Sequence, residues 1–334
     1  MVKPDFDPSA LEKVLGGPVE LRPVTSGQSN PTWFVTCGTR DLVLRKKPSG
    51  TTLSSAHAVD REYTVMNALR TTSVPVPAMV LFEADETVLG TPFYLMQRLE
   101  GTVSEDSSLP ELDVQGRETL YADAAQTLAQ LHRVDWNAVG LAEFGRSDGY
   151  YARQVKRWSR QWEATCSEAN PRIEELTAWF RANIPAENKT TIVHGDYRIG
   201  NLMYDPATAH IRGVLDWELS TLGDPMADLA HWLMFYEFAP SQLGGIAGLG
   251  VAGLGIPSAS RFLDLYREAG GEEAECLPFH RAFAFYRMAI IFEGILARAR
   301  TGQAASADAL EVGALAPVCT GLAEKIISKD ICRV

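Results

Sequence analysis

The sequence predicts an α+β protein with two lobes, a small strand-rich lobe over residues 1–100 and a larger, mostly helical lobe over residues 101–334. Short runs of β-branched and aromatic residues separated by polar turns occupy the first third of the chain. After about residue 102 the apolar residues recur at helical spacing instead. The chain has 334 residues, of which 46% are hydrophobic, and this is enough for two lobes with their own cores.

In the first lobe, strands are predicted at residues 21–24, 33–36, 41–47 and 91–97. A helix is predicted at residues 57–69, because its apolar residues form one stripe. In the second lobe a small β insert at residues 191–193, 202–204 and 211–215 interrupts the helices. The predicted helices span residues 112–132, 150–168, 173–184, 225–237, 258–270 and 278–301.

The β insert carries the most informative motif of the chain. His194-Gly-Asp196 is followed five residues later by Asn201, and Asp216 comes after the next strand. In this order Asp196 can accept the proton of an attacking hydroxyl, while Asn201 and Asp216 offer oxygen ligands for Mg²⁺. Protein kinases use H-R-D-x-x-x-x-N and D-F-G, and here H-G-D-x-x-x-x-N and D-W-E stand in the same order. We therefore predict that Asp196, Asn201 and Asp216 form a phosphoryl-transfer site using ATP and Mg²⁺, with the last two as metal ligands.

Further blocks at residues 43–48, 55–63, 75–77, 153–158 and 216–230 accompany this motif. Together they resemble the aminoglycoside-phosphotransferase and choline-kinase superfamily, and in particular the kinase-like domain fused to some acyl-CoA dehydrogenases. The resemblance covers most of the chain. It implies a bilobal protein-kinase-like fold, a small-molecule hydroxyl as phosphoryl acceptor, and a functional link to an acyl-CoA dehydrogenase.

A kinase needs a cation on its third strand to hold the α- and β-phosphates and to pair with a glutamate on the next helix. Arg45 stands at this position, where the superfamily usually has lysine, and Glu62 is its predicted partner. Lys47 shares the strand face of Arg45 and is a second candidate. Lys46 points to the other face, where a solvated strand end is the simplest interpretation.

Two further segments are predicted to contact the nucleotide. The resemblance places a hinge after residue 97, where backbone groups of Gln97 and Leu99 would bind adenine. A polar turn between the first two strands offers N–H groups and hydroxyls to phosphates, although alone it is equally typical of a plain hairpin. Its candidate residues are Ser26, Gly27, Ser29 and Asn30.

Two carboxylates behind the motif have supporting or open roles. Asp228 falls one turn into an apolar helix, where a buried carboxylate needs partners. In the superfamily the matching aspartate braces the catalytic loop, so Asp228 and His194 are expected to be structural supports. Glu218 would face the same side as Asp216 if the strand continued, and there it would contact a second metal, the substrate or solvent.

The acceptor is predicted from a cationic stripe at positions i, i+3, i+4 and i+7 of one helix. The stripe consists of Arg153, Lys156, Arg157 and Arg160. It favours an anionic acceptor such as a hydroxy acid or a hydroxyacyl-CoA, with a solvated helix face as the alternative. Arg198 in the catalytic loop is a further substrate candidate, and Arg287, Glu293 and Arg298 are weaker ones. The alternatives are an aminoglycoside or choline-like kinase, whose cationic substrate favours acidic or aromatic walls, and a nucleotide-binding protein without transfer activity.

Composition limits the remaining classes. A net charge of −11 argues against nucleic acid as the main partner. Five scattered cysteines, an N-terminus without an apolar signal segment and the lack of an apolar run of about 18 residues predict a cytoplasmic protein that does not enter membranes. Gly248–Gly253 matches G-x-G-x-x-G, but it follows a predicted helix rather than a strand. We therefore interpret it as a loop between helices and not as a dinucleotide site.

Overall fold

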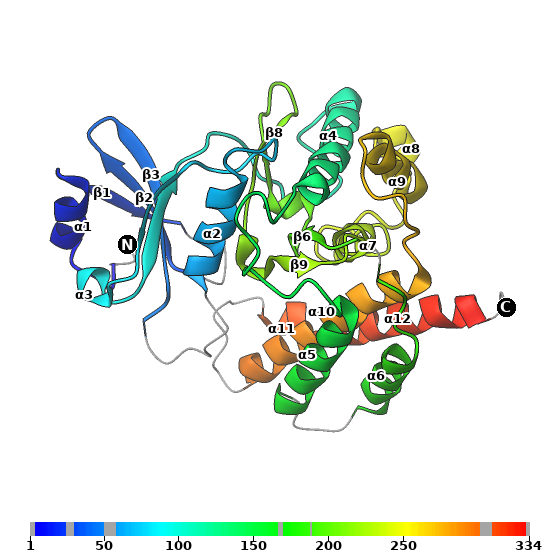
Figure 1. The fold of residues 1–334 in the computed structure, drawn as a ribbon. Helices are drawn as coiled ribbons and strands as arrows, with labels where there is room; N and C mark the ends of the chain where they lie inside the picture. The colour runs from blue at the N-terminus through cyan, green and yellow to red at the C-terminus, as the bar shows by residue number, and fades with distance from the viewer. Residues whose placement is uncertain are drawn as a thin grey trace.

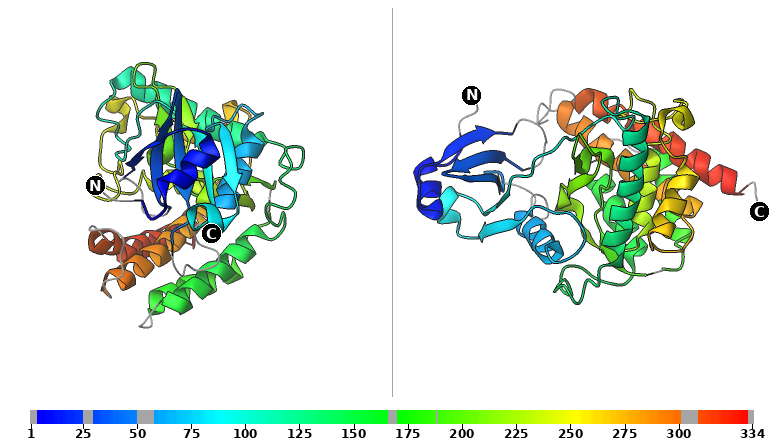
Figure 2. Two further views of the ribbon diagram at one scale, coloured as in Figure 1. Left: turned by 90° about the vertical axis from the view of Figure 1, so that its left-hand side faces the viewer. Right: turned by 90° about the horizontal axis from the view of Figure 1, so that it is seen from above.

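The computed structural model describes residues 4–24, 30–49, 58–165, 170–187, 189–300 and 309–331. The sheet with helices α1 to α3 forms one lobe, and the long helices form the other (Figure 1). Helix α2 lies between the sheet and the helical lobe (Figures 1 and 2). The predicted two-lobed α+β arrangement is confirmed, whereas the exact boundary at residue 100 stays a prediction.

The first lobe is one antiparallel sheet of five strands in the order β1-β2-β3-β5-β4. Helices α1 and α3 cover one face, where Leu11, Trp33, Leu44 and Phe93 form a buried cluster. Helix α2 packs against β4 and β5. The elements are α1 (Pro8–Leu15), β1 (Glu20–Pro23), β2 (Thr32–Cys37), β3 (Arg40–Lys46), α2 (Val59–Leu69), β4 (Met79–Glu83), α3 (Glu86–Leu89) and β5 (Phe93–Gln97).

The helical lobe packs around α4 and α10, and two small sheets lie beside α4. Antiparallel β6 and β9 form one of these sheets, and β7 and β8 form the other. Its helices are α4 (Val114–Arg133), α5 (Tyr150–Thr165), α6 (Pro171–Ala182), α7 (Met226–Met234), α8 (Val251–Leu254), α9 (Ala259–Glu268), α10 (Pro278–Arg300), α11 (Ala309–Gly313) and α12 (Ala316–Ile331). Its strands and 3₁₀ turns are β6 (Thr191–Val193), η1 (Ile199–Asn201), β7 (Leu202–Tyr204), β8 (Ile211–Val214), η2 (Trp217–Leu219) and β9 (Thr221–Gly223). No helix in the described ranges combines the length and the apolar character that crossing a membrane requires.

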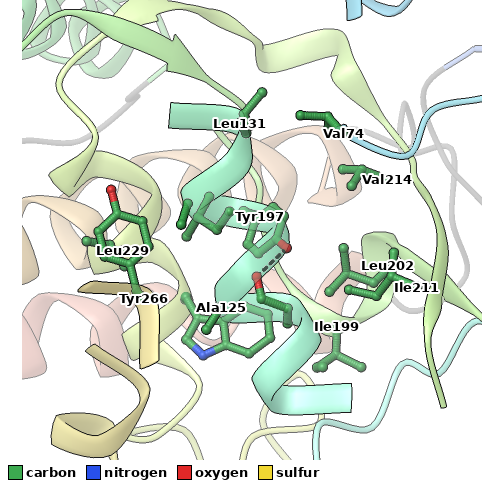
Figure 3. Close-up of a cluster of buried hydrophobic side chains, with 14 of the residues drawn as sticks. Val74, Ala125, Leu131, Tyr197, Ile199, Leu202, Ile211, Val214, Leu229 and Tyr266 are labelled. Atoms are coloured by element: carbon green, nitrogen blue, oxygen red, sulfur yellow. Dashed lines mark hydrogen bonds between the residues drawn. The ribbon is translucent and has the colours of Figure 1, made fainter. Parts of the chain in front are cut away.

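A buried cluster anchors the loop between β6 and β7 on α4. The side chain of Tyr197 is fully buried, and its hydroxyl donates to the carbonyl oxygen of Ala124 at 2.8 Å (Figure 3). Leu202, Ile211 and Val214 of the hairpin belong to the same cluster. The catalytic motif therefore lies on a well-packed support.

The interpretation of Lys46 as a solvated strand end is wrong. Its side chain is fully buried, with Nζ 2.8 Å from Asp5 Oδ1 and 5.3 Å from the centre of the Phe6 ring. The N-terminal residues cover this face of β3, a long-range contact that strand alternation does not reveal.

Candidate active site

The loop after β6 is held by Asp228, as the resemblance implied. Its two carboxylate oxygens accept hydrogen bonds from the backbone N–H groups of His194 and Gly195, both at 2.7 Å. His132 Nε2 lies 3.2 Å from the same carboxylate. Burial alone would raise the pKa of Asp228, but His132 and these N–H groups keep it below its ordinary value. A buried carboxylate thus fixes the loop through two charge-assisted hydrogen bonds.

Gly195 has a backbone conformation that other residues rarely adopt. Its φ is +85°, and a Cβ atom here would lie 2.7 Å from the carbonyl oxygen of Leu219. Glycine is the residue that accommodates both the positive φ and this close approach. The next residue, Asp196, has a side chain that is partly exposed, whereas Asp228 is fully buried.

Asp196 is partly accessible and is held at both carboxylate oxygens. Asn201 Nδ2 donates to Oδ2 at 2.8 Å, and His231 Nε2 lies 2.7 Å from Oδ1. Arg198 Nε lies 3.9 Å from Oδ2. Burial alone would raise the pKa of Asp196, but His231 and the two arginines Arg198 and Arg287 keep it well below its usual range. The carboxylate is therefore charged at neutral pH, as a proton acceptor must be.

The β7–β8 hairpin brings Asn201 and Asp216 to the same end. Leu202 pairs with Val214, and the N–H of Leu215 donates to the carbonyl oxygen of Asn201 at 2.9 Å. Asn201 uses its Nδ2 to contact Asp196, which leaves its Oδ1 as a possible metal ligand. Asp216 has φ +62°, an uncommon conformation for a residue with a side chain.

These two side chains fit a Mg²⁺ ion that is completed by phosphate and water oxygens. Both offer hard oxygen atoms, and Mg²⁺ is usually held by one or two protein carboxylates together with substrate phosphates. Within the described ranges no group of three or more His, Cys, Asp or Glu side chains is arranged as a metal site. A cage made of protein ligands alone is therefore not what this part of the chain provides.

Arg45 of β3 reaches across to this end of the hairpin. Its Nη2 donates to Asp216 Oδ1 at 2.8 Å, and its Nε lies 3.3 Å from Glu62 Oε2 on α2. The predicted pairing of Arg45 with Glu62 is thereby confirmed. Glu218 Oε2 lies 3.9 Å from the same guanidinium. Strand β8 ends at Val214 and does not continue to Glu218, so the condition for the predicted side of Glu218 is not met, and the 3₁₀ turn η2 brings Glu218 to this position.

Glu62 is buried in a network that the sequence did not reveal. Its side chain is fully buried and accepts hydrogen bonds from Asn30 Nδ2 at 2.7 Å and from the Tyr94 hydroxyl at 2.8 Å. Burial raises the pKa of Glu62, and Arg45 opposes this shift. Tyr94 pairs directly with Arg45 across β3 and β5, so the strand register explains why it lies here.

The other residues predicted to bind nucleotide lie at the predicted hinge, at the end of β3 and in the segment before β2. The N–H of Gln97 donates to the carbonyl oxygen of Ala78 at 2.8 Å, so Gln97 retains its carbonyl for an adenine ring. The N–H of Leu99 makes no backbone hydrogen bond within the described ranges. Lys47 follows β3, where its backbone bonds to Pro92 and Thr91. The turn candidates Ser26, Gly27 and Ser29 lie outside the described residues.

The predicted cationic stripe lines an open groove of about 460 Å³ along α5. Arg153 there donates from Nη2 to the carbonyl oxygen of Arg146 at 2.8 Å. Arg198, in contrast, is engaged by Glu105 Oε2 at 3.0 Å. The lining residues of the groove are Arg146, Arg153, Lys156, Arg157, Arg160, Gln161 and Ala164.

Sequence reasoning missed His231 and gave Arg287 little weight. His231 lies three residues after Asp228 on a helix, so the two share one face, and this spacing was the available signal. Arg287 lies on α10 and donates from Nη2 to the carbonyl oxygen of Gly195, beside Asp196. The glycine-rich segment Gly248–Gly253 follows helix α7 rather than a strand, but its second half lies in the short helix α8, so its interpretation as a loop is wrong in part. The absence of a dinucleotide site there stays a prediction.

Comparison with known proteins connects these features to a family. The family model described as the phosphotransferase enzyme family matches residues 20–286. Acyl-CoA dehydrogenase family member 10 of Mus musculus is 41% identical over 337 residues, which cover 97% of this chain and 31% of that protein. Family member 11 of Gallus gallus is 38% identical, covering 96% of this chain and 43% of that protein. The chain thus spans less than half the length of these curated relatives.

Solved structures give the same result for the fold. The crystal structure of a candidate aminoglycoside phosphotransferase from Ralstonia eutropha is 37% identical, with a TM-score of 0.87, and the match covers 97% of this chain and 99% of that chain. The aminoglycoside phosphotransferase APH(4)-Ia, in complex with ADP and hygromycin B, is 15% identical with a TM-score of 0.62. That match covers 94% of this chain and 97% of that chain, and it bears on the fold alone. The predicted resemblance and the protein-kinase-like fold are confirmed.

Proposed function

We propose that this chain, which belongs to the phosphotransferase enzyme family and is a small-molecule kinase, transfers the γ-phosphoryl group of ATP to the hydroxyl of a hydroxy acid or hydroxyacyl-CoA. The arrangement around Asp196 carries the proposal. Its charged carboxylate is anchored by Asn201 and His231, next to the hairpin end that presents Asp216.

In this mechanism Asp196 accepts the proton of the acceptor hydroxyl while that oxygen forms a bond to the γ-phosphorus. The bond from the γ-phosphorus to the β,γ-bridging oxygen breaks, and ADP leaves. Arg45 holds phosphate oxygens, and Glu62 keeps the guanidinium in place. Asn201 and Asp216 would hold Mg²⁺, which neutralises charge on the phosphates. Positioning and charge neutralisation supply most of the rate in such reactions, so the fixed loop geometry matters more than the basicity of Asp196.

The basic groove along α5 supports an anionic acceptor. Five of its seven lining residues are Arg or Lys in a chain whose net charge is −11. Such a wall repels cationic antibiotics and choline and attracts carboxylates and phosphates. The names of the relatives add support, because an acyl-CoA dehydrogenase acts on acyl-CoA thioesters. A functional link to such a dehydrogenase is part of this proposal.

Aminoglycoside phosphorylation is the second candidate. It is favoured by the 37% identity to a candidate aminoglycoside phosphotransferase over nearly the whole chain. The two candidates share their chemistry and differ in the charge of the acceptor.

Mg·ATP-dependent ADP release, measured across hydroxy acids, their CoA thioesters, aminoglycosides and choline, tests the proposal. We expect stimulation by the anionic class, with turnover lost by at least about 10³-fold in Asp196→Ala while nucleotide affinity is retained. Asp205→Ala, at the far end of the same hairpin, is the control. Stimulation by aminoglycosides alone would support the second candidate. Binding of nucleotide with no transfer to any class would point to a binding protein instead.

A further inference from the structure

Arg287 is a buried cation that forms no ion pair with a carboxylate among the described residues, although its charge helps to keep the pKa of Asp196 low. Its exposed fraction is 9%, and its hydrogen bond from Nη2 goes to the carbonyl oxygen of Gly195. Its Nε has no acceptor in the described part of the chain. A guanidinium withdrawn from water costs free energy unless an anion compensates it, so a molecule bound next to it is the expected counter-charge.

Arg287 lies beside the loop that carries Asp196, the proposed proton acceptor. Gly195, whose carbonyl it binds, directly precedes Asp196. Asp196 contacts Asn201 and His231 and forms no ion pair with Arg287, so Arg287 acts on this carboxylate only at longer range. An acceptor whose hydroxyl reaches Asp196 therefore passes close to a positively charged group that is not part of the nucleotide site.

A second arginine, Arg157, lies near Arg287 and extends the positive charge toward the groove along α5. The guanidinium carbon of Arg287 lies 5.9 Å from the centre of the Trp158 ring on α5, and that of Arg157 lies 5.2 Å from the same ring. Arg157 also lines the open groove along α5, which packs against α10. Two guanidinium groups around one indole repel each other, and an oxyanion near them relieves that repulsion.

We propose that Arg287 is the specificity-determining residue of the acceptor site, where its guanidinium binds an oxyanion of the acceptor and so holds the acceptor hydroxyl at Asp196. This inference rests on the proposed phosphotransfer function and adds the group that selects the substrate. The oxyanion is a carboxylate in a hydroxy acid or a phosphate in a CoA thioester. Arginine suits both through paired N–H donors.

The test compares matched acceptors that differ in one charged group. Hydroxy acids of three to six carbons are compared with their primary amides, and hydroxyacyl-CoA thioesters with hydroxyacyl-pantetheine thioesters, which lack the phosphates. The wild-type enzyme is expected to prefer the anionic member of at least one pair by about tenfold or more in kcat/KM, the size of a lost charged contact. The pair that shows the preference identifies the source of the oxyanion.

Arg287→Gln should bring that ratio close to one, with the KM for ATP changed by less than about threefold, because only the acceptor loses a contact. Arg287→Lys, which keeps the charge, should retain part of the ratio even if Arg287→Gln folds poorly. Arg281→Gln is the matched control, because it removes an arginine of the same helix that pairs with Glu237 at 2.8 Å, and it should leave the ratio unchanged.

The outcomes separate the two proposals. If Arg287→Gln lowers turnover of both members of each pair equally, Arg287 only supports the Gly195 loop and the inference is wrong. A wild-type enzyme that transfers phosphate without preference for the anionic member also overturns it. If no hydroxyl acceptor of any class is phosphorylated, the proposed function itself fails.

Discussion

Arg45 contacts residues from two segments far apart in the sequence, and this explains how an arginine can stand where the superfamily usually has lysine. Glu62 lies 3.3 Å from its Nε, and Asp216 accepts from its Nη2 at 2.8 Å. A lysine has a single charged nitrogen, whereas the planar guanidinium presents several donors in fixed directions. The buried Glu62 therefore fixes the orientation of Arg45, and Tyr94 and Asn30 fix Glu62.

The substitution Tyr94→Phe tests whether Tyr94 holds Glu62 and, through Glu62, holds Arg45. Removing the hydroxyl deletes one hydrogen bond to a buried carboxylate, so Arg45 is held less firmly. We expect the KM for ATP to rise about fivefold, with a smaller change in the KM for the acceptor, as loss of one bond to a charged group predicts. Steady-state kinetics with each substrate varied in turn measures the difference. Tyr63→Phe, a partly buried tyrosine whose hydroxyl makes no hydrogen bond in the described ranges, is the control. Equal effects of the two substitutions would contradict the role of Tyr94.

Single residues also show where sequence reasoning is sufficient and where it is not. The pairing of Arg45 with Glu62 follows from the order of strand and helix, and the support of the loop by Asp228 follows from the resemblance to the superfamily, although the residues are far apart in sequence. His231 and Tyr94 carry no motif of their own. Their roles come from the helix face shared with Asp228 and from strand register with Arg45, and both depend on how the elements pack.

At the scale of elements, α10 carries a titrating residue that the site does not use. His280 in its first turn is buried, accepts a hydrogen bond from the N–H of Leu277 at 3.0 Å, and stacks on Tyr151. Burial lowers the pKa of His280 to about 4. Between the unfolded value of about 6.5 and this folded value, the unfolded chain binds a proton that the folded chain resists.

The folded protein should therefore lose stability as the pH falls through this window. From pH 7 to pH 5 the contribution of His280 to the free energy of unfolding should drop by about 2 kcal/mol. His280→Gln should lack this component, which urea unfolding at the two pH values measures. His210→Gln, at an exposed position, is the control and should keep the full pH dependence. An unchanged pH dependence in His280→Gln would show that other groups are responsible.

Elements with strong periodicity were predicted best. The long helices α4, α5, α6 and α10 begin and end within a few residues of their predicted ranges, because each is a long segment in which apolar residues recur at helical spacing. Helices α1, α3, α8, α11 and α12 and strands β4 and β9 were not predicted as separate elements. Strand β9 has three residues and exists by pairing with β6, so its backbone conformation depends on a partner 30 residues earlier in the chain.

On the scale of the whole molecule, the bond from Arg45 to Asp216 connects the two lobes. It joins strand β3 to the end of the β7–β8 hairpin where Asn201 and Asp216 lie. A nucleotide with Mg²⁺ would bind between the same two side chains. Because each of them then has a partner of opposite charge on the ligand, the complex should be more stable than the free protein.

Binding of nucleotide between Arg45 and Asp216 should stabilise the folded protein more when Mg²⁺ is present. ADP should raise the Tm of the wild-type protein more in Mg²⁺ than in EDTA, because the metal adds a link from phosphate to Asp216. In Asp216→Asn most of that extra increase should vanish, whereas Asp205→Asn at the other end of the hairpin should retain it. Differential scanning calorimetry provides the measurement. An Asp216→Asn protein with an undiminished response to Mg²⁺ would remove Asp216 from the metal site.

The β7–β8 hairpin also holds the segments on both sides of the lobe boundary. Thr102 and Tyr204 exchange backbone hydrogen bonds of 2.8 and 2.9 Å, and the N–H of Val214 donates to the carbonyl oxygen of Pro75 at 2.8 Å. Arg61 of α2 adds a contact from its Nη2 to the carbonyl oxygen of Ser220 at 3.3 Å. Because the same hairpin presents Asn201 and Asp216, a substitution that shifts the hairpin should disturb the connection between the lobes as well as the site.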